Sequence, residues 1–147
     1  MALTQAMCTS FKTELLTGNH NFTNGTDVFN LALFAAAASQ TSDFGPATTN
    51  YSEMSTNEAS GTNYTAGGAA LTNVTPFASG TTAITDFNDL TFSAVTITSS
   101  GALIYNTSFG NAAVGVYNFG LDITVNNGEM TINFPTPDAA NGVIRIA

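Results

Sequence analysis

The side chains that carry most acid–base, metal and phosphate chemistry are nearly absent from this chain. Its 147 residues include one histidine, His20, one cysteine, Cys8, and two basic residues, Lys12 and Arg145, against ten acidic residues. Nucleophilic catalysis needs a base placed beside the nucleophile, and a zinc site needs several histidine or cysteine ligands. We therefore expect a protein that is not an enzyme, with no catalytic residue, no bound metal and no cofactor.

The single cysteine and the single histidine each have a simple structural interpretation. Cys8 lies among apolar residues without a basic neighbour, which favours a buried, unreactive thiol. The alternative is an exposed thiol that forms an intermolecular disulfide. His20 stands between Asn19 and Asn21, and we expect it to be a surface or loop-packing residue.

Two carboxylates and one pair of glycines are candidate binding sites. Asp86 and Asp89 are close in sequence and could bind calcium through their oxygens, but turn formation and solvation are the favoured roles of such residues. Gly67 and Gly68 are not followed by the Lys-Ser/Thr pair of a phosphate-binding loop. We expect a tight turn there.

The low number of basic residues and the short apolar runs of the chain argue against two classes of partner, nucleic acids and membranes. The formal net charge is -8, the pI is near 4.1 and only 8% of the residues are charged. Proteins that bind nucleic acid need lysine or arginine to neutralise phosphates, so we expect no nucleic-acid partner. The longest apolar run, 31–38, is shorter than the roughly 20 residues that span a membrane. The first residues also lack a positively charged leader, so we expect synthesis in the cytoplasm and no membrane partner.

The N-terminal residues predict an amphipathic helix over 3–17, within an N-terminal unit of residues 1–18. Its apolar stripe has a spacing of four and consists of Leu3, Met7, Phe11 and Leu15. Gly18 is a suitable residue to end the helix. The stripe is expected to pack on the core of its own chain, and the alternative is that these four residues form an interface with a partner.

Residues 28–147 predict a β-rich body, and no linker divides the chain, so we expect a single domain over 1–147. A run that is apolar on both faces over 28–37 predicts a central strand. Further strands are expected at 70–77, 81–87, 90–98, 102–105, 112–119, 122–125, 129–134 and 142–147. The sequence Asn126-Asn127-Gly128 predicts a hairpin turn, and Pro76 is expected to end a strand. The fold class is mainly β: an antiparallel β-sandwich or jelly-roll-like barrel with one N-terminal helix.

Several segments resemble small virion structural proteins of tailed bacteriophages. They are residues 3–12 (LTQAMCTSFK), 61–68 (GTNYTAGG), 71–75 (LTNVT), 101–106 (GALIYN) and 144–146 (IRI). The resemblance extends over the whole chain and implies a component of the phage particle. It names no catalytic residue.

Two roles on such a particle fit the composition. The first is a capsid decoration, or cement, protein, a homotrimer on the outer surface of the virion that binds the major capsid protein and bridges its subunits. A surface with few charges and many threonine and asparagine side chains suits close packing against neighbours. The alternative is a tail, head-fibre or other surface module that binds a host receptor or glycan, with Tyr51, Tyr64, Tyr105 and Tyr117 stacking on sugars.

Overall fold

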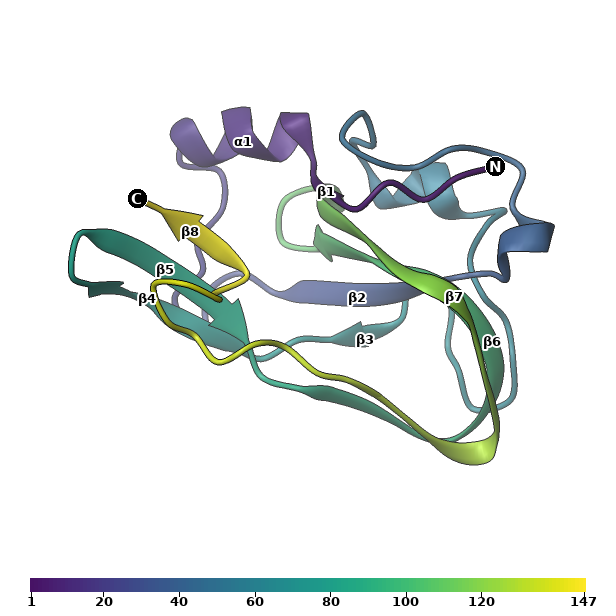
Figure 1. The fold of residues 1–147 in the computed structure, drawn as a ribbon. Helices are drawn as coiled ribbons and strands as arrows, with labels where there is room; N and C mark the ends of the chain where they lie inside the picture. The colour runs from purple at the N-terminus through teal and green to yellow at the C-terminus, as the bar shows by residue number, and fades with distance from the viewer.

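Two antiparallel sheets and one α-helix make up the computed structural model, which describes all residues from Met1 to Ala147 (Figure 1). The strands are β1 (Ala6–Met7), β2 (Phe29–Phe34), β3 (Ala69–Ala70), β4 (Asn73–Ser79), β5 (Thr82–Phe87), β6 (Leu90–Asn106), β7 (Ala112–Ile132) and β8 (Ile144–Ile146). The helices are α1 (Thr9–Leu16) and the short 3-10 helices η1 (Ala37–Ser39) and η2 (Tyr51–Met54). The larger sheet has the order β1-β7-β6-β2-β3 and the smaller one β4-β5-β8. The predicted mainly β, sandwich-like fold with one N-terminal helix is confirmed.

The helix α1 is half as long as the sequence predicts, because the first residues are extended. Ala6 pairs with Val116 of β7, and the Thr4 amide donates to the Phe44 carbonyl at 2.8 Å. The predicted helix over 3–17 is therefore wrong for its first turn and a half. An apolar spacing of four fits a strand, which repeats every two residues, as well as a helix. The predicted end is confirmed, since Gly18 follows the helix with a positive φ of 77°.

Strand β2 is the central strand that its sequence predicts. It lies between β6 and β3 in the larger sheet. Both of its faces are covered, because neighbours such as Leu33 and Phe34 point to opposite sides and are each 0% exposed. The strand thus forms the middle of the core.

Strands β6 and β7 form one long ribbon, where the sequence predicted several shorter strands. Their pairing runs from Leu90 opposite Ile132 to Asn106 opposite Ala112. The predicted hairpin turn at 126–128 is wrong: these residues lie inside β7, where the register shifts and Asn127 has φ 45°. An Asn-Gly pair tolerates positive φ, which a β-bulge can use as well as a turn. Figure 1 shows both strands bending together at this point.

The smaller sheet is made of the hairpin β4–β5 and the C-terminal strand β8. The prediction that Pro76 ends a strand is wrong. Pro76 lies within β4, at a shift of register between Val74 and Phe77. Because β4 is an edge strand, the missing N–H of proline costs no hydrogen bond of the sheet. A cluster of 26 buried residues, from Leu3 to Ile144, joins the helix and both sheets in one core.

Candidate functional site

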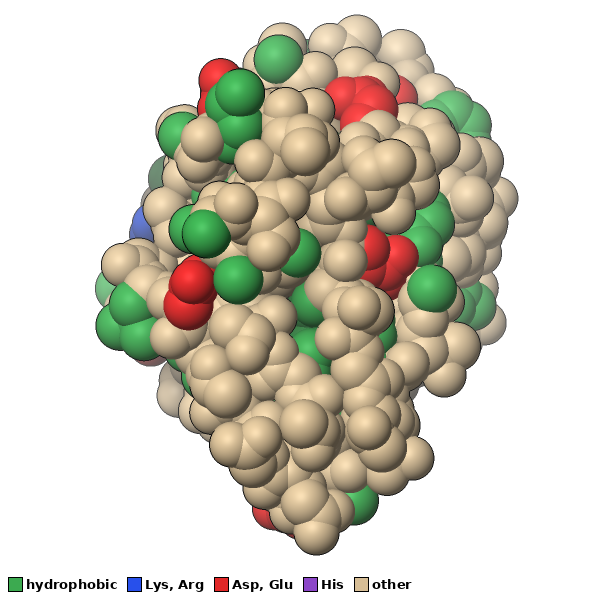
Figure 2. All heavy atoms as spheres, turned by 90° about the vertical axis from the view of Figure 1, so that its right-hand side faces the viewer, with side chains coloured by type: hydrophobic (Ala, Val, Ile, Leu, Met, Phe, Trp, Pro, Cys, Tyr) green, Lys and Arg blue, Asp and Glu red, His purple; other side chains and the backbone are tan.

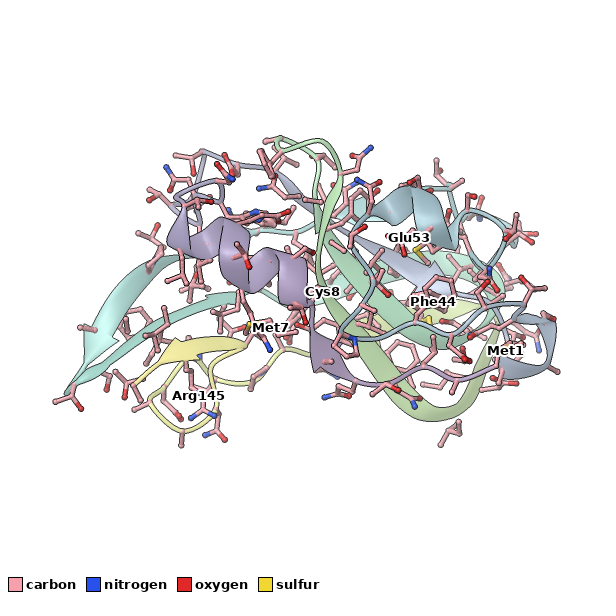
Figure 3. The ribbon with its side chains drawn as sticks, turned by 90° about the horizontal axis from the view of Figure 1, so that it is seen from above. Met1, Met7, Cys8, Phe44, Glu53 and Arg145 are labelled. Carbon is pink, nitrogen blue, oxygen red and sulfur yellow. The ribbon has the colours of Figure 1, made fainter.

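The four stripe residues all contact the core of their own chain. Leu3 and Phe11 are buried, and Met7 and Leu15 are partly buried against the same cluster. Figure 3 shows Met7 and Cys8 at the start of α1, with Met1 far from the helix, beyond Phe44. The stripe thus has the expected core-packing role. The apolar side chain that α1 does expose is Leu16, at 88%, which lies outside the predicted stripe.

Cys8 is the buried, free thiol that the sequence predicts. Its side chain is 0% exposed, and its Sγ lies 3.9 Å from the Gly45 carbonyl oxygen. Burial, followed by the nearby carboxylates of Glu53 and Glu14, raises the pKa of the thiol to about 12. The reactive thiolate form is therefore negligible near neutral pH.

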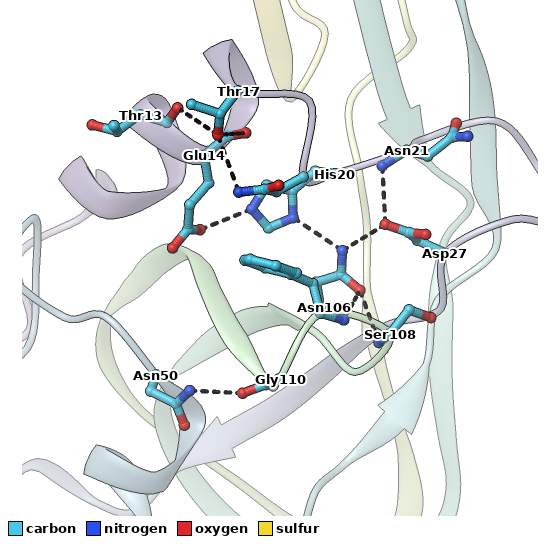
Figure 4. Close-up of polar contacts among 12 residues, drawn as sticks. Thr13, Glu14, Thr17, His20, Asn21, Asp27, Asn50, Asn106, Ser108 and Gly110 are labelled. Carbon is cyan, nitrogen blue, oxygen red and sulfur yellow. Dashed lines mark hydrogen bonds and ion pairs between the residues drawn. The ribbon is translucent and has the colours of Figure 1, made fainter.

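His20 lies in a buried polar network that the sequence did not reveal (Figure 4). Its Nε2 lies 2.9 Å from Oε2 of Glu14 in α1, and its Nδ1 lies 3.0 Å from Nδ2 of Asn106 at the end of β6. The same Nδ2 donates to Oδ2 of Asp27 at 2.8 Å. The ring also packs against Phe11, with centroids 4.8 Å apart. The expected loop-packing role is confirmed, and the ring is buried, not on the surface.

The hydrogen bonds of Asn106 determine which nitrogen of His20 carries the proton. Oδ1 of Asn106 accepts from the amides of Ser108 and Phe109, at 2.9 and 3.2 Å. This fixes Nδ2 of Asn106 as the group that faces His20, so Nδ1 of the ring is an acceptor and Nε2–H donates to Glu14. Both ring nitrogens are therefore used to connect α1, the following loop and β6.

Asp86 and Asp89 cap backbone amides in separate places. Asp86 is 0% exposed and accepts from the amides of Phe87 and Val143, at 2.7 and 3.1 Å. Burial raises the pKa of this carboxyl, although the two hydrogen bonds act in the opposite direction. Asp89 accepts from the Phe134 amide at 2.8 Å. No group of three or more histidine, cysteine or acidic side chains is arranged to hold a metal ion.

Three of the four tyrosines belong to one network around Glu58. The carboxylate accepts from the hydroxyls of Tyr51 and Tyr64, at 2.6 and 2.8 Å, and from the Gly67 amide at 2.7 Å. The Tyr105 hydroxyl donates to the Gly67 carbonyl at 2.7 Å, and its ring stacks on Tyr51 with centroids 4.5 Å apart. Burial raises the pKa of all three hydroxyls. These tyrosines hold a loop in place, and Tyr105 is too deeply buried to meet a ligand.

The turn held by this network is the one predicted at Gly67 and Gly68. Both residues have positive φ, 95° and 72°. A Cβ atom on Gly68 would lie 1.8 Å from the carbonyl oxygen of Leu31 in β2. Glycine is therefore required both for the conformation and for the close approach to the central strand.

The outer surface of the β6–β7 ribbon is polar and carries cross-strand threonine pairs. The hydroxyls of Thr98 and Thr124 are 2.9 Å apart, and those of Thr91 and Thr131 are 2.8 Å apart. Near the bend, a hollow of about 480 Å³ is lined mainly by hydroxyl, amide and methyl groups, with Glu58 as its one charged residue. Figure 2 views the side of the molecule that carries η1 and the bend, where acidic and hydrophobic side chains are scattered without forming one large patch.

Comparison with known proteins assigns no function to these residues. No protein-family model, no curated protein and no solved structure matches the chain. None of its helices has the length and apolar character needed to cross a membrane.

Proposed function

We propose that this protein is a virion structural protein of a tailed bacteriophage, most simply a capsid decoration protein that binds the major capsid protein on the outside of the head. The observation that carries the proposal is a scaffold of two β-sheets whose surface has few charges and many threonines. Hydrogen-bonded threonine pairs such as Thr98–Thr124 lie on the outer face of the β6–β7 ribbon. Such a face can pack closely against repeated copies of a partner.

The net charge of -8 supports a position outside the head. An acidic surface is repelled by packaged DNA. Lys12 and Arg145 are the only basic side chains that could offset this repulsion. Exposed apolar side chains, including Leu16 at 88% and Leu121 at 65%, give the surface places where a partner can remove apolar area from water.

The alternative is a tail, head-fibre or other surface module that binds a host receptor or glycan. The hollow near the bend favours it, because hydroxyl and amide groups are suitable partners for sugar hydroxyls. The tyrosines do not favour it, since Tyr51 and Tyr105 stack on each other and three tyrosine hydroxyls are already hydrogen-bonded.

Copy number in purified particles separates the two roles. Quantitative mass spectrometry should find this chain at a ratio near one to the major capsid protein if it decorates the head. A ratio of a few per hundred would assign it to the tail or fibres. Complete absence from particles would overturn a virion role.

A further inference from the structure

The outer edge of β7 is unpaired over its second half. On the side away from β6, β1 pairs with Gly115 and Val116, and the Asn118 side-chain amide donates to the Leu3 carbonyl at 2.8 Å. Residues 119–132 form no backbone hydrogen bond on that side. The Gly120 amide donates to Oδ1 of Asn118 at 2.8 Å, and the outward backbone groups beyond it are free to pair with another strand.

Four of the other sheet edges are short or blocked, and the edge of β6 away from β7 pairs with β2 only from Gly101 onward, with a single bridge between Thr96 and Thr62 before it. Strands β1 and β3 have two residues each and β8 has three. Strand β4 carries Pro76 at its register shift. Natural sheets limit unwanted pairing in these ways. The second half of β7 has no proline or lysine, and its bulge at 126–128 divides the open edge into two parts, 119–125 and 129–132.

An apolar groove runs beside this open edge. It consists of three adjoining cavities of about 280, 360 and 370 Å³. The first two share Tyr117 and Val143, and the last two share Phe119 and Ile132. The groove thus follows β7 between the larger sheet and the segment that leads to β8. Its half-buried apolar side chains, such as Ile123, are those that one more strand would cover.

The charges beside the groove indicate what kind of strand fits. Glu129 is the one charged residue in its lining, and Asp122 is exposed on the same strand. No lysine or arginine lines any of the three cavities. A second copy of this chain would bring the same acidic strand against this one, whereas a basic strand from another protein would be attracted.

We propose that this groove binds an extended segment of a partner protein, which adds as a further strand on the open edge of β7. The segment would have apolar side chains at alternate positions to fill the groove, and a lysine or arginine close to Glu129. This inference deepens the proposed function and rests on it in one respect. On a phage head, the partner segment would belong to the major capsid protein.

The probe is a synthetic peptide of about eleven residues that alternates valine and threonine and has a lysine at each end and one in the middle. The control peptide has the same sequence but carries N-methyl groups on every second backbone amide, so its charges are unchanged and its strand pairing is lost. Fluorescence anisotropy of labelled peptides should show at least about tenfold tighter binding of the unmodified peptide. Equal binding by both peptides would overturn the proposal, since only charge would then be acting.

Matched variants locate the peptide on the protein. Ile123→Glu puts a charge in the groove and should weaken binding at least about tenfold. Thr124→Glu adds the same charge on the opposite face of β7 and should change binding by less than about twofold. Circular dichroism checks that both variants are folded.

Hydrogen exchange on the unaltered protein gives a test that does not depend on any variant. The peptide should slow exchange of amides within 119–132, and exchange that is unchanged there would overturn the proposal. A dimer in sedimentation experiments that protects the same amides without peptide would also overturn it, because a second copy would then be the occupant. If the peptide binds but the protein is absent from phage particles, the proposed strand-binding groove is supported and the virion role is rejected.

Discussion

At the scale of single residues, the polar side chains buried in this protein connect elements of the fold. Asn106 is the clearest example, because it is 0% exposed and uses both ends of its amide. Asp86 similarly joins β5 to the segment before β8. Each has a defined set of partners, so its replacement has a predictable effect.

Asn106→Asp should lower the free energy of unfolding by about 3 kcal/mol or more. The change puts a carboxylate oxygen where Nδ2 now lies, 2.8 Å from the acidic oxygen of Asp27. Thermal or urea unfolding measures the loss. Asn126→Asp adds the same charge at an exposed position and should have little effect. Equal stability of the two variants would show that the buried network contributes nothing.

The pH dependence of stability should carry a contribution from Asp86. Burial raises the pKa of this carboxyl in the folded state above 3.8, so the folded protein holds the proton more tightly than the unfolded chain. Its contribution to stability is therefore complete below pH 3.8 and is lost as the pH rises through the folded-state pKa. Asp86→Asn should remove this loss. Urea unfolding from pH 3.5 to 7 would contradict the prediction if the difference between the wild type and the variant stayed constant.

At the scale of elements, α1 is held to the sheets mainly by one aromatic side chain. Phe11 is the only fully buried residue of the helix, and its ring packs against His20 and Phe22, with centroid distances of 4.8 and 6.0 Å. The helix has only eight residues, which is too short to be stable without packing.

Phe11→Ala should therefore cost about 3–5 kcal/mol of unfolding free energy. Leu16→Ala, on the exposed side of the same helix, should change it by less than about 0.5 kcal/mol. Chemical denaturation of the two variants makes the comparison. A similar effect at both positions would mean that α1 is not anchored through Phe11.

At the scale of the whole molecule, like charges repel one another with few attractive pairs to compensate. The formal net charge is -8, and the single ion pair, between Glu14 and His20, forms only when the histidine is protonated. Salt screens charges that are more than about 10 Å apart at 0.1 M ionic strength. The charges lie closer together in the folded state than in the expanded unfolded chain. Screening should therefore lower the free energy of the folded state by more than that of the unfolded chain.

The melting temperature should rise when sodium chloride is increased from about 0.02 to 0.5 M, because screening weakens the repulsion. Glu129→Lys changes the net charge by two and should raise the melting temperature at low salt by more than at high salt. Calorimetry at both salt concentrations tests this. An equal shift of the variant at both concentrations would show that the repulsion does not limit stability.

Sequence patterns alone determined the parts of this protein that depend on local chemistry. The apolar residues on both faces of 28–37 predicted the central strand that the structure places at 29–34. Gly18 predicted the helix end, and the surroundings of Cys8 predicted a buried thiol. Tertiary structure decided the features for which local patterns have two solutions. A spacing of four between Leu3 and Met7 suits helix and strand alike, and pairing with β7 selects the strand. Asn127 and Gly128 could form a turn or a bulge, and continuous pairing with β6 selects the bulge. The open groove beside β7 also depends on the tertiary structure, because folding brings together residues from β6, β7 and the segment before β8 that are far apart in the sequence.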